Sequence, residues 1–163
     1  MIFVVLGSRM FQFDRLLKEI DNLIEKGVIK DTVFAQIGSS TYRPRNYAYK
    51  EFLDQAEFKT YIEQADIIIT HAGTGSIITS LQAGKTVIAV ARLKQYHEVV
   101  DDHQLEIVRK FSEMGMVIGV ENVAQLETTL LKLDAQHVNQ FVSNTQHIIG
   151  LIEDFIGKQV KKV

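Results

Sequence analysis

The residues best suited to chemistry form a short turn of small and polar side chains, Thr70–Ser76, with the sequence THAGTGS. This turn follows an apolar run over residues 65–69 and precedes a helical pattern over residues 77–83. A turn between a buried strand and a helix leaves backbone N–H groups unpaired at the positive end of the helix dipole. Because such N–H groups bind phosphate, the turn predicts a site for a nucleotide or a phosphorylated ligand.

Two common phosphate-binding motifs do not fit the glycines. The dinucleotide fingerprint needs a third glycine after Gly73 and Gly75, but Ile78 stands there. It also needs an acidic residue after the next strand, which is followed by Arg92 instead. A P-loop would place Gly84 and the lysine and threonine after it between a strand and a helix, whereas here they follow a helix and precede a strand. Gly84 is therefore interpreted as a helix C-cap.

The remaining interpretation is a mononucleotide diphosphate on the helix that begins near Ser76. The hydroxyls of Thr74 and Ser76 and the imidazole of His71 would donate to phosphate oxygens. An alternative stays open on the pattern alone, because threonine or serine at such a turn often only caps the helix.

A second polar segment, Arg92–Gln104, follows the next predicted strand. It is therefore expected at the same edge of the sheet, where the loops at the carboxyl ends of the strands form a rim. Its carboxylates, amides and imidazoles are the side chains that bind sugar hydroxyls. In the alternative interpretation the segment is a solvated loop in which Asp101 or Asp102 caps the helix that carries His103. A metal site at these three residues is disfavoured because adjacent side chains diverge at a helix start.

The elements that would position these residues alternate along the chain. Continuous Val- and Ile-rich runs predict strands with both faces covered, over Ile2–Leu6, Thr32–Ile37, Ile67–Thr70, Val87–Ala91 and Met116–Val120, with a weaker candidate at Tyr47–Leu53. Apolar positions at helical spacing predict helices between Asp14, as N-cap, and Gly27, before Gly84, before Gly115, and over Leu126–Leu133. The fold class is thus α/β, a Rossmann-like open parallel sheet with helices on both faces, and strand-end loops form the ligand crevice.

Bulk composition excludes several classes of protein. The 163 residues fit a single domain, and the net charge of −2 argues against a nucleic-acid partner. The absence of cysteine excludes disulfide frameworks and thiolate metal sites, and it is compatible with the cytoplasm. The apolar start ends at Gly7, too early for a signal peptide or a membrane span.

The combination of residues 71–76, Gly84, Arg92, Glu98 and Asp101–Gln104 resembles the C-terminal, donor-binding domain of glycosyltransferase family 28. Within that family, the chain looks like the catalytic subunit of split transferases acting on lipid-linked sugars. One eukaryotic relative extends a dolichol-linked precursor with N-acetylglucosamine, and bacterial relatives serve capsule or exopolysaccharide assembly. The spacing from Arg92 to Gln104 resembles the bacterial group most.

The resemblance implies one half of a GT-B enzyme that binds a UDP-sugar over the single domain 1–163. Its donor-site residues would be Gly7, Ser8, His71, Gly73, Thr74, Gly75, Ser76, Arg92, Asp102, His103 and Gln104. No metal or other cofactor is expected. The general base is not identifiable, and Glu98, Asp101 and Asp102 are the weak candidates.

A GT-B enzyme needs a second domain for the acceptor, so we expect a separate, membrane-anchored partner subunit that binds a lipid-linked saccharide. The enzyme would then work in the cytoplasm at the inner face of the membrane. A helical tail over about 142–163 carries an apolar stripe for that partner or for the chain's own sheet. Two other functions stay open: a non-catalytic nucleotide-sugar-binding regulatory subunit, and another Rossmann-like enzyme acting on a nucleotide phosphate.

Overall fold

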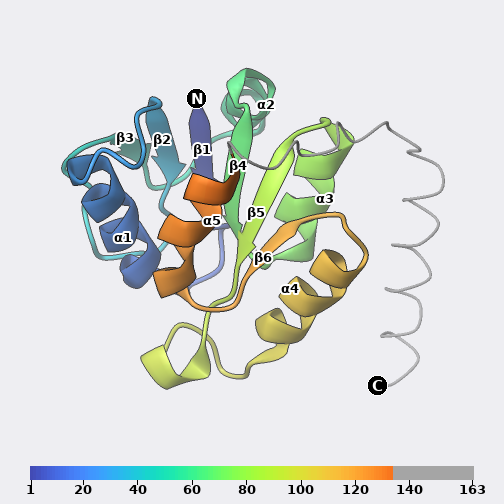
Figure 1. The fold of residues 1–163 in the computed structure, drawn as a ribbon. Helices are drawn as coiled ribbons and strands as arrows, with labels where there is room; N and C mark the ends of the chain where they lie inside the picture. Colours follow the sequence, from blue (N-terminus) through green and yellow to red (C-terminus); the bar gives the residue numbers. More distant parts are fainter. Residues whose placement is uncertain (134–163) are drawn as a thin grey trace.

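The central element of the molecule is one parallel sheet. The computed structural model describes residues 1–133, and their six strands pair in the order β3-β2-β1-β4-β5-β6 (Figure 1). The chain therefore starts in the middle of the sheet, builds outward to one edge, and crosses back to build the other. The strand bounds are β1 Ile2–Val5, β2 Val33–Gln36, β3 Ala48–Lys50, β4 Ile67–His71, β5 Thr86–Val90 and β6 Ile118–Val120.

Helices cover both faces of this sheet. α1 (Asp14–Glu25) and α5 (Leu126–Leu133) pack on one face, and α2 (Gln55–Gln64), α3 (Thr74–Gln82) and α4 (His103–Glu113) pack on the other (Figure 1). Two short 3₁₀ turns, η1 (Lys94–Tyr96) and η2 (Val123–Gln125), follow β5 and β6. The carboxyl ends of the strands, where the predicted site should lie, are at the lower edge of the sheet in this view.

Alternation of apolar side chains along the strands builds the two layers. In β1, Ile2 and Val4 face the core under α1 and α5, whereas Phe3 and Val5 face the core under α2. All four side chains are almost fully buried. A strand buried on both faces requires the continuous apolar run seen in the sequence, so the predicted fold class is confirmed.

All five predicted strands are present, and β3 confirms the sixth candidate. The last strand is shorter than predicted and begins at Ile118. The helix ends predicted at Gly27, Gly84 and Gly115 are also confirmed, because each glycine has a positive φ after a helix. The tail over 142–163 lies outside the described residues.

The sequence did not predict α2, and it assigned the wrong N-cap to α1. The N-cap of α1 is Phe13, because the carboxylate of Asp14 accepts hydrogen bonds from the backbone N–H groups of Thr41 and Tyr42. Asp14 thus ties the loop after β2 to α1. Within residues 1–133, no helix is both long and apolar enough to cross a membrane.

Candidate functional site

The loops that follow β1, β2, β4 and β5 meet at one edge of the sheet. Gly7 has a φ of +73°, and a Cβ there would lie 2.6 Å from Cε1 of His71. A Cβ on Gly73 would likewise overlap the His71 ring. The carbonyl of Gly7 accepts a hydrogen bond from Nε2 of Gln36, at the end of β2. Both glycines are therefore required so that the β1 loop and the β4 turn can approach the imidazole.

His71 is the side chain around which these loops close. Its Nδ1 lies 3.2 Å from the carbonyl oxygen of Val5. Since a carbonyl only accepts, Nδ1 carries the proton and Nε2 of the neutral ring is an acceptor. Burial, the positive charge of Arg92 and, more weakly, that of Arg9 lower the pKa of His71 to about 4. At neutral pH the ring must therefore take up a proton on Nε2 before it can donate to a phosphate oxygen.

The N-terminus of α3 provides unpaired backbone donors next to this ring. α3 begins at Thr74 with Gly73 as its N-cap, and glycine has no side chain that could accept from the first turn. The first helical hydrogen bond runs from the N–H of Ile77 to the carbonyl of Gly73, at 3.1 Å. The N–H groups of Thr74, Gly75 and Ser76 precede this bond and are available to a ligand, which is the backbone arrangement that the predicted anion site (the anion seat) would require.

Arg92 lies beneath the rim and not on it. Only 1% of the residue is exposed, and one terminal nitrogen donates to the carbonyls of Leu6 (2.9 Å) and Phe11 (3.1 Å). Its backbone N–H donates to Oε1 of Gln104, at 3.2 Å. The prediction that Arg92 contacts the ligand directly is wrong, because its guanidinium is enclosed. Gln104 is partly buried, and it joins α4 to the end of β5.

Glu98, a candidate general base, is fully buried in an ion pair. Nε and a terminal nitrogen of Arg15 each donate to one carboxylate oxygen at 3.0 Å, and the N–H of Leu93 donates to Oε2 at 2.9 Å. The side chain is 1% exposed. A carboxylate held in this way has no access to an acceptor hydroxyl, so this candidate is corrected: Glu98 holds η1 against α1.

The other two carboxylate candidates are exposed and organise the start of α4. Asp101 Oδ1 accepts from the N–H of His103 at 3.0 Å, and Asp102 Oδ1 accepts from the N–H of Lys94 at 2.9 Å. Asp102 is the N-cap of α4 by position, although its side chain does not cap the helix. His103 is exposed, and its Nδ1 lies 3.5 Å from Glu106. These residues share the rim with the β4 turn, but among the described residues no hydrogen bond or ion pair joins them to His71.

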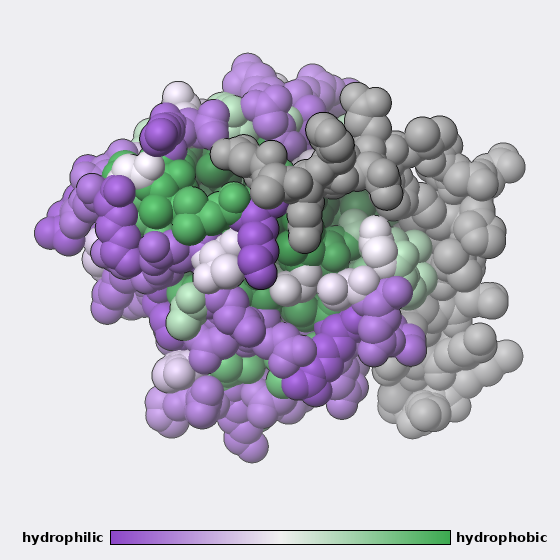
Figure 2. Space-filling view, in the orientation of Figure 1, coloured by the Kyte–Doolittle hydropathy of each residue, from purple (hydrophilic) through white to green (hydrophobic). Residues whose placement is uncertain are grey.

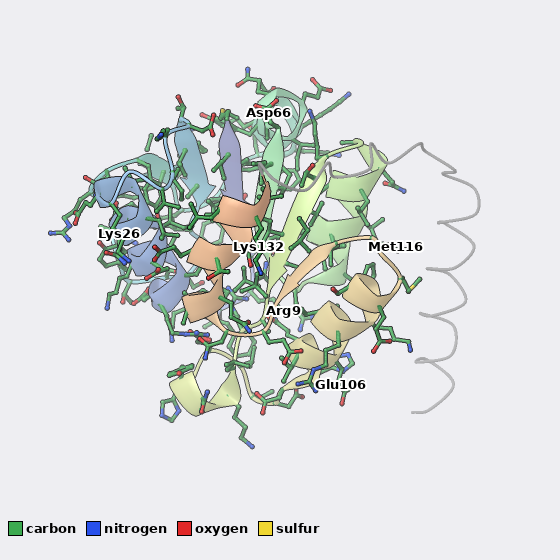
Figure 3. All side chains as sticks on the ribbon, viewed as in Figure 1. Arg9, Lys26, Asp66, Glu106, Met116 and Lys132 are labelled. Atoms are coloured by element: carbon green, nitrogen blue, oxygen red, sulfur yellow. The ribbon has the colours of Figure 1, made fainter. Side chains whose placement is uncertain are left out.

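The exposed part of the rim is polar and partly basic. Figure 2 shows mostly hydrophilic residues over η1 and α4 on the face in view. Arg9 and Ser8, in the β1 loop, are exposed, and Figure 3 labels Arg9 at this end of the sheet. Met10 is 93% exposed next to them. That Gly7 and Ser8 contact the ligand stays a prediction.

A cavity that the sequence did not predict lies beside α1. This cavity of about 670 Å³ is adjacent to the rim and is lined mainly by α1, η1 and the residues around η2, including Arg15, Lys18, Tyr96 and Asn122. Within residues 1–133, no group of three or more acidic or histidine side chains could hold a metal ion.

The chain is similar in sequence to known glycosyltransferase proteins. The family model described as glycosyltransferase family 28 C-terminal domain matches residues 1–155. The chain is 33% identical over 99 residues to the UDP-N-acetylglucosamine transferase subunit ALG13 of Candida albicans, covering 61% of this chain and 32% of that protein. It is 28% identical over 129 residues to the mouse protein of the same name, covering 69% of this chain and 10% of that protein. The chain therefore spans about a third or less of these relatives.

Solved structures share the fold. A glycotransferase of kitacinnamycin superposes with a TM-score of 0.63 at 17% identity, covering 97% of this chain and 43% of that one. MurG of Acinetobacter baumannii superposes with a TM-score of 0.54 at 17% identity, covering 93% of this chain and 49% of that one. In each of them the matched region is about half of the chain.

Proposed function

Because the chain belongs to the glycosyltransferase family 28 C-terminal domain family, we propose that it is the donor-binding, catalytic subunit of a split transferase. It would transfer a sugar from a UDP-sugar to a lipid-linked saccharide. One observation carries the proposal: the glycine-capped start of α3 and the Gly7 loop meet around His71 at the carboxyl edge of the sheet, an arrangement suited to an anion. The names of the curated relatives support UDP-N-acetylglucosamine as the first donor to test.

The main work of this site would be to stabilise the departing UDP. Preorganised N–H groups at Thr74, Gly75 and Ser76 and the dipole of α3 favour the charge that develops on the diphosphate. A diphosphate near His71 raises the pKa of the imidazole, so that Nε2 takes up a proton and donates to a phosphate oxygen. Gln104, with Asp102 and His103 beside it, would contact the sugar. Neither step requires a metal or another cofactor.

The contacts of the three candidate carboxylates support a separate partner subunit. Glu98 is enclosed by Arg15, and Asp101 and Asp102 each hold a backbone N–H of the rim. A base for the acceptor hydroxyl would then come from the subunit that binds the acceptor. We place this partner at the inner face of the membrane, where it would anchor the cytoplasmic chain. The saccharide product would serve capsule or exopolysaccharide assembly.

The test has a binding part and a transfer part. Calorimetry on the purified chain should show UDP and UDP-N-acetylglucosamine binding more tightly than AMP and NAD. With the acceptor-binding partner present, the pair should transfer sugar to a lipid-linked acceptor. Replacement of His71 by asparagine should weaken both, whereas Lys59→Ala, on the exposed side of α2, should change neither.

Two results would contradict the proposal. If UDP bound no better than AMP or NAD, the site would not be a UDP-sugar site. If UDP bound but the complete pair transferred no sugar, the chain would be a nucleotide-sugar-binding regulatory subunit.

A further inference from the structure

Arg92 is the largest of the fully buried side chains in the part of the chain that the structure describes. Burying a guanidinium is costly unless its charge and its N–H groups are compensated. Here the compensation is incomplete. Among residues 1–133, Nε of Arg92 has no hydrogen-bond partner. The nearby carboxylate of Glu98 is shared with Arg15, which holds both of its oxygens. Two buried or half-buried cations thus face one anion.

The contacts of Arg92 connect three segments of the rim. Its terminal nitrogen bridges the carbonyls of Leu6 and Phe11, which are the two ends of the loop that carries Gly7 and Ser8. Its backbone N–H is held by Gln104, in the first turn of α4. The ring of Phe13 lies under the guanidinium, 5.4 Å from its central carbon. The side chain of Arg92 therefore holds the two ends of the β1 loop, and its backbone N–H joins the end of β5 to the start of α4.

The excess charge of this cluster lies close to the anion seat. Arg92 acts on His71 strongly enough to be the main charge that disfavours protonation of the imidazole. His71 in turn touches Gly7 and Gly73 at the start of α3. A cation buried in a medium of low dielectric acts over a longer range than one in water. An anion bound at the start of α3 would therefore feel Arg92 without touching it.

We infer that Arg92 is a positioning residue for the donor diphosphate: it fixes the Gly7–Ser8 loop and supplies a buried positive charge beneath it. The inference rests on the proposed function, because it takes the ligand to be a UDP-sugar. It differs from a purely structural role in one respect. A structural role affects every ligand of the rim equally, whereas a buried charge matters in proportion to the charge of the ligand.

The experiment compares UDP with uridine on the full chain by calorimetry. Arg92→Met keeps most of the volume and removes the charge, and it should weaken UDP binding by about tenfold while changing uridine binding by less than about twofold. Arg109→Met is the matched control: it removes an exposed arginine that pairs with Glu121 and lies outside this cluster. It should leave the ratio of UDP to uridine affinity unchanged.

Arg92→Lys keeps the inference testable if the methionine variant does not fold. A buried lysine loses its proton more readily than an arginine does. Burial lowers the pKa of Arg92 itself to about 10, so the comparison stays below that value. The UDP affinity of this variant, relative to the wild type, should fall several-fold between pH 7 and pH 9. The charged or titratable groups that face position 92, Glu98, Arg15 and His71, are present in both proteins.

The outcomes distinguish a failure of the proposed function from a failure of the inference on Arg92. If the wild type does not prefer UDP to uridine, the proposed function fails. If the wild type prefers UDP but Arg92→Met weakens UDP and uridine equally, or the relative affinity of Arg92→Lys is independent of pH, the inference on Arg92 fails and the proposed function stands.

Discussion

Mild acid should destabilise the folded chain through His71. Its pKa is about 4 in the folded state and 6.5 as a free side chain. Between these values the unfolded chain binds a proton that the folded chain does not bind, so stability rises with pH and is lost as pH falls below about 6.5. Lowering the pH from 7.5 to 5 should cost about 2 kcal/mol, from ~1.36 kcal/mol for each pH unit below 6.5.

The cause of this cost is the surroundings of the ring. Burial disfavours the charged imidazolium, and Arg92 and Arg9 add repulsion, whereas the hydrogen bond with the Val5 carbonyl is too weak to offset them. His71→Asn is the matched variant, because an asparagine amide can still donate to that carbonyl and does not titrate.

Urea unfolding followed by far-ultraviolet circular dichroism at pH 7.5 and pH 5.0 measures the effect. The midpoint of the wild type should fall by roughly 1 M more than that of His71→Asn over this pH change. The other four of the five histidines are common to both proteins and cancel in the difference. An equal loss in both proteins would mean that His71 is protonated in the folded state, and the electrostatic account of the site would be wrong.

Three further outcomes follow from the same contacts. Gly7→Ala should lower stability by about 2 kcal/mol in thermal unfolding, because it forces a positive φ and a clash with His71; an unchanged melting temperature would contradict the close approach. Glu98→Gln should cost about 3 kcal/mol in urea, because it leaves Arg15 and Arg92 without their buried anion. UDP-N-acetylglucosamine binding at pH 6 should take up a proton, seen by calorimetry in buffers of different ionisation enthalpy, and His71→Asn should abolish this uptake.

Local pattern was sufficient for most of the fold. The strands are continuous apolar runs because both faces of the sheet are covered, and the helix ends carry glycines with positive φ. α2 was missed because it has few fully buried positions and is anchored by distant aromatic rings: Tyr61 stacks on Phe34 with centroids 3.9 Å apart. A local signal did exist, since Asp54 and Glu57 form a capping box at its start.

Only part of the candidate site could likewise be predicted from local sequence. The β4 turn could be predicted because a glycine-rich strand-to-helix turn is local and its N–H groups belong to the backbone. The burial of Arg92 and Glu98 could not, because it depends on Leu6 and Arg15, which are more than 80 residues away in the sequence. Charged side chains in a polar segment look exposed when their partners lie in another element.

The burial of Arg92 and Glu98 changes the chemistry that we expect of the chain. Residues 92–104 contain three carboxylates, one of which is enclosed, while the other two hold backbone N–H groups. The groups that can stabilise an anion outnumber the free carboxylates. They are the unpaired N–H groups at the start of α3, a histidine that can be protonated, and a buried arginine beneath the β1 loop. Such an arrangement suits the stabilisation of a departing diphosphate more than the activation of an acceptor. Under the proposed function the chain supplies the donor half of the reaction and a partner supplies the acceptor half, so the reconstituted pair, rather than the isolated chain, is the decisive test of activity.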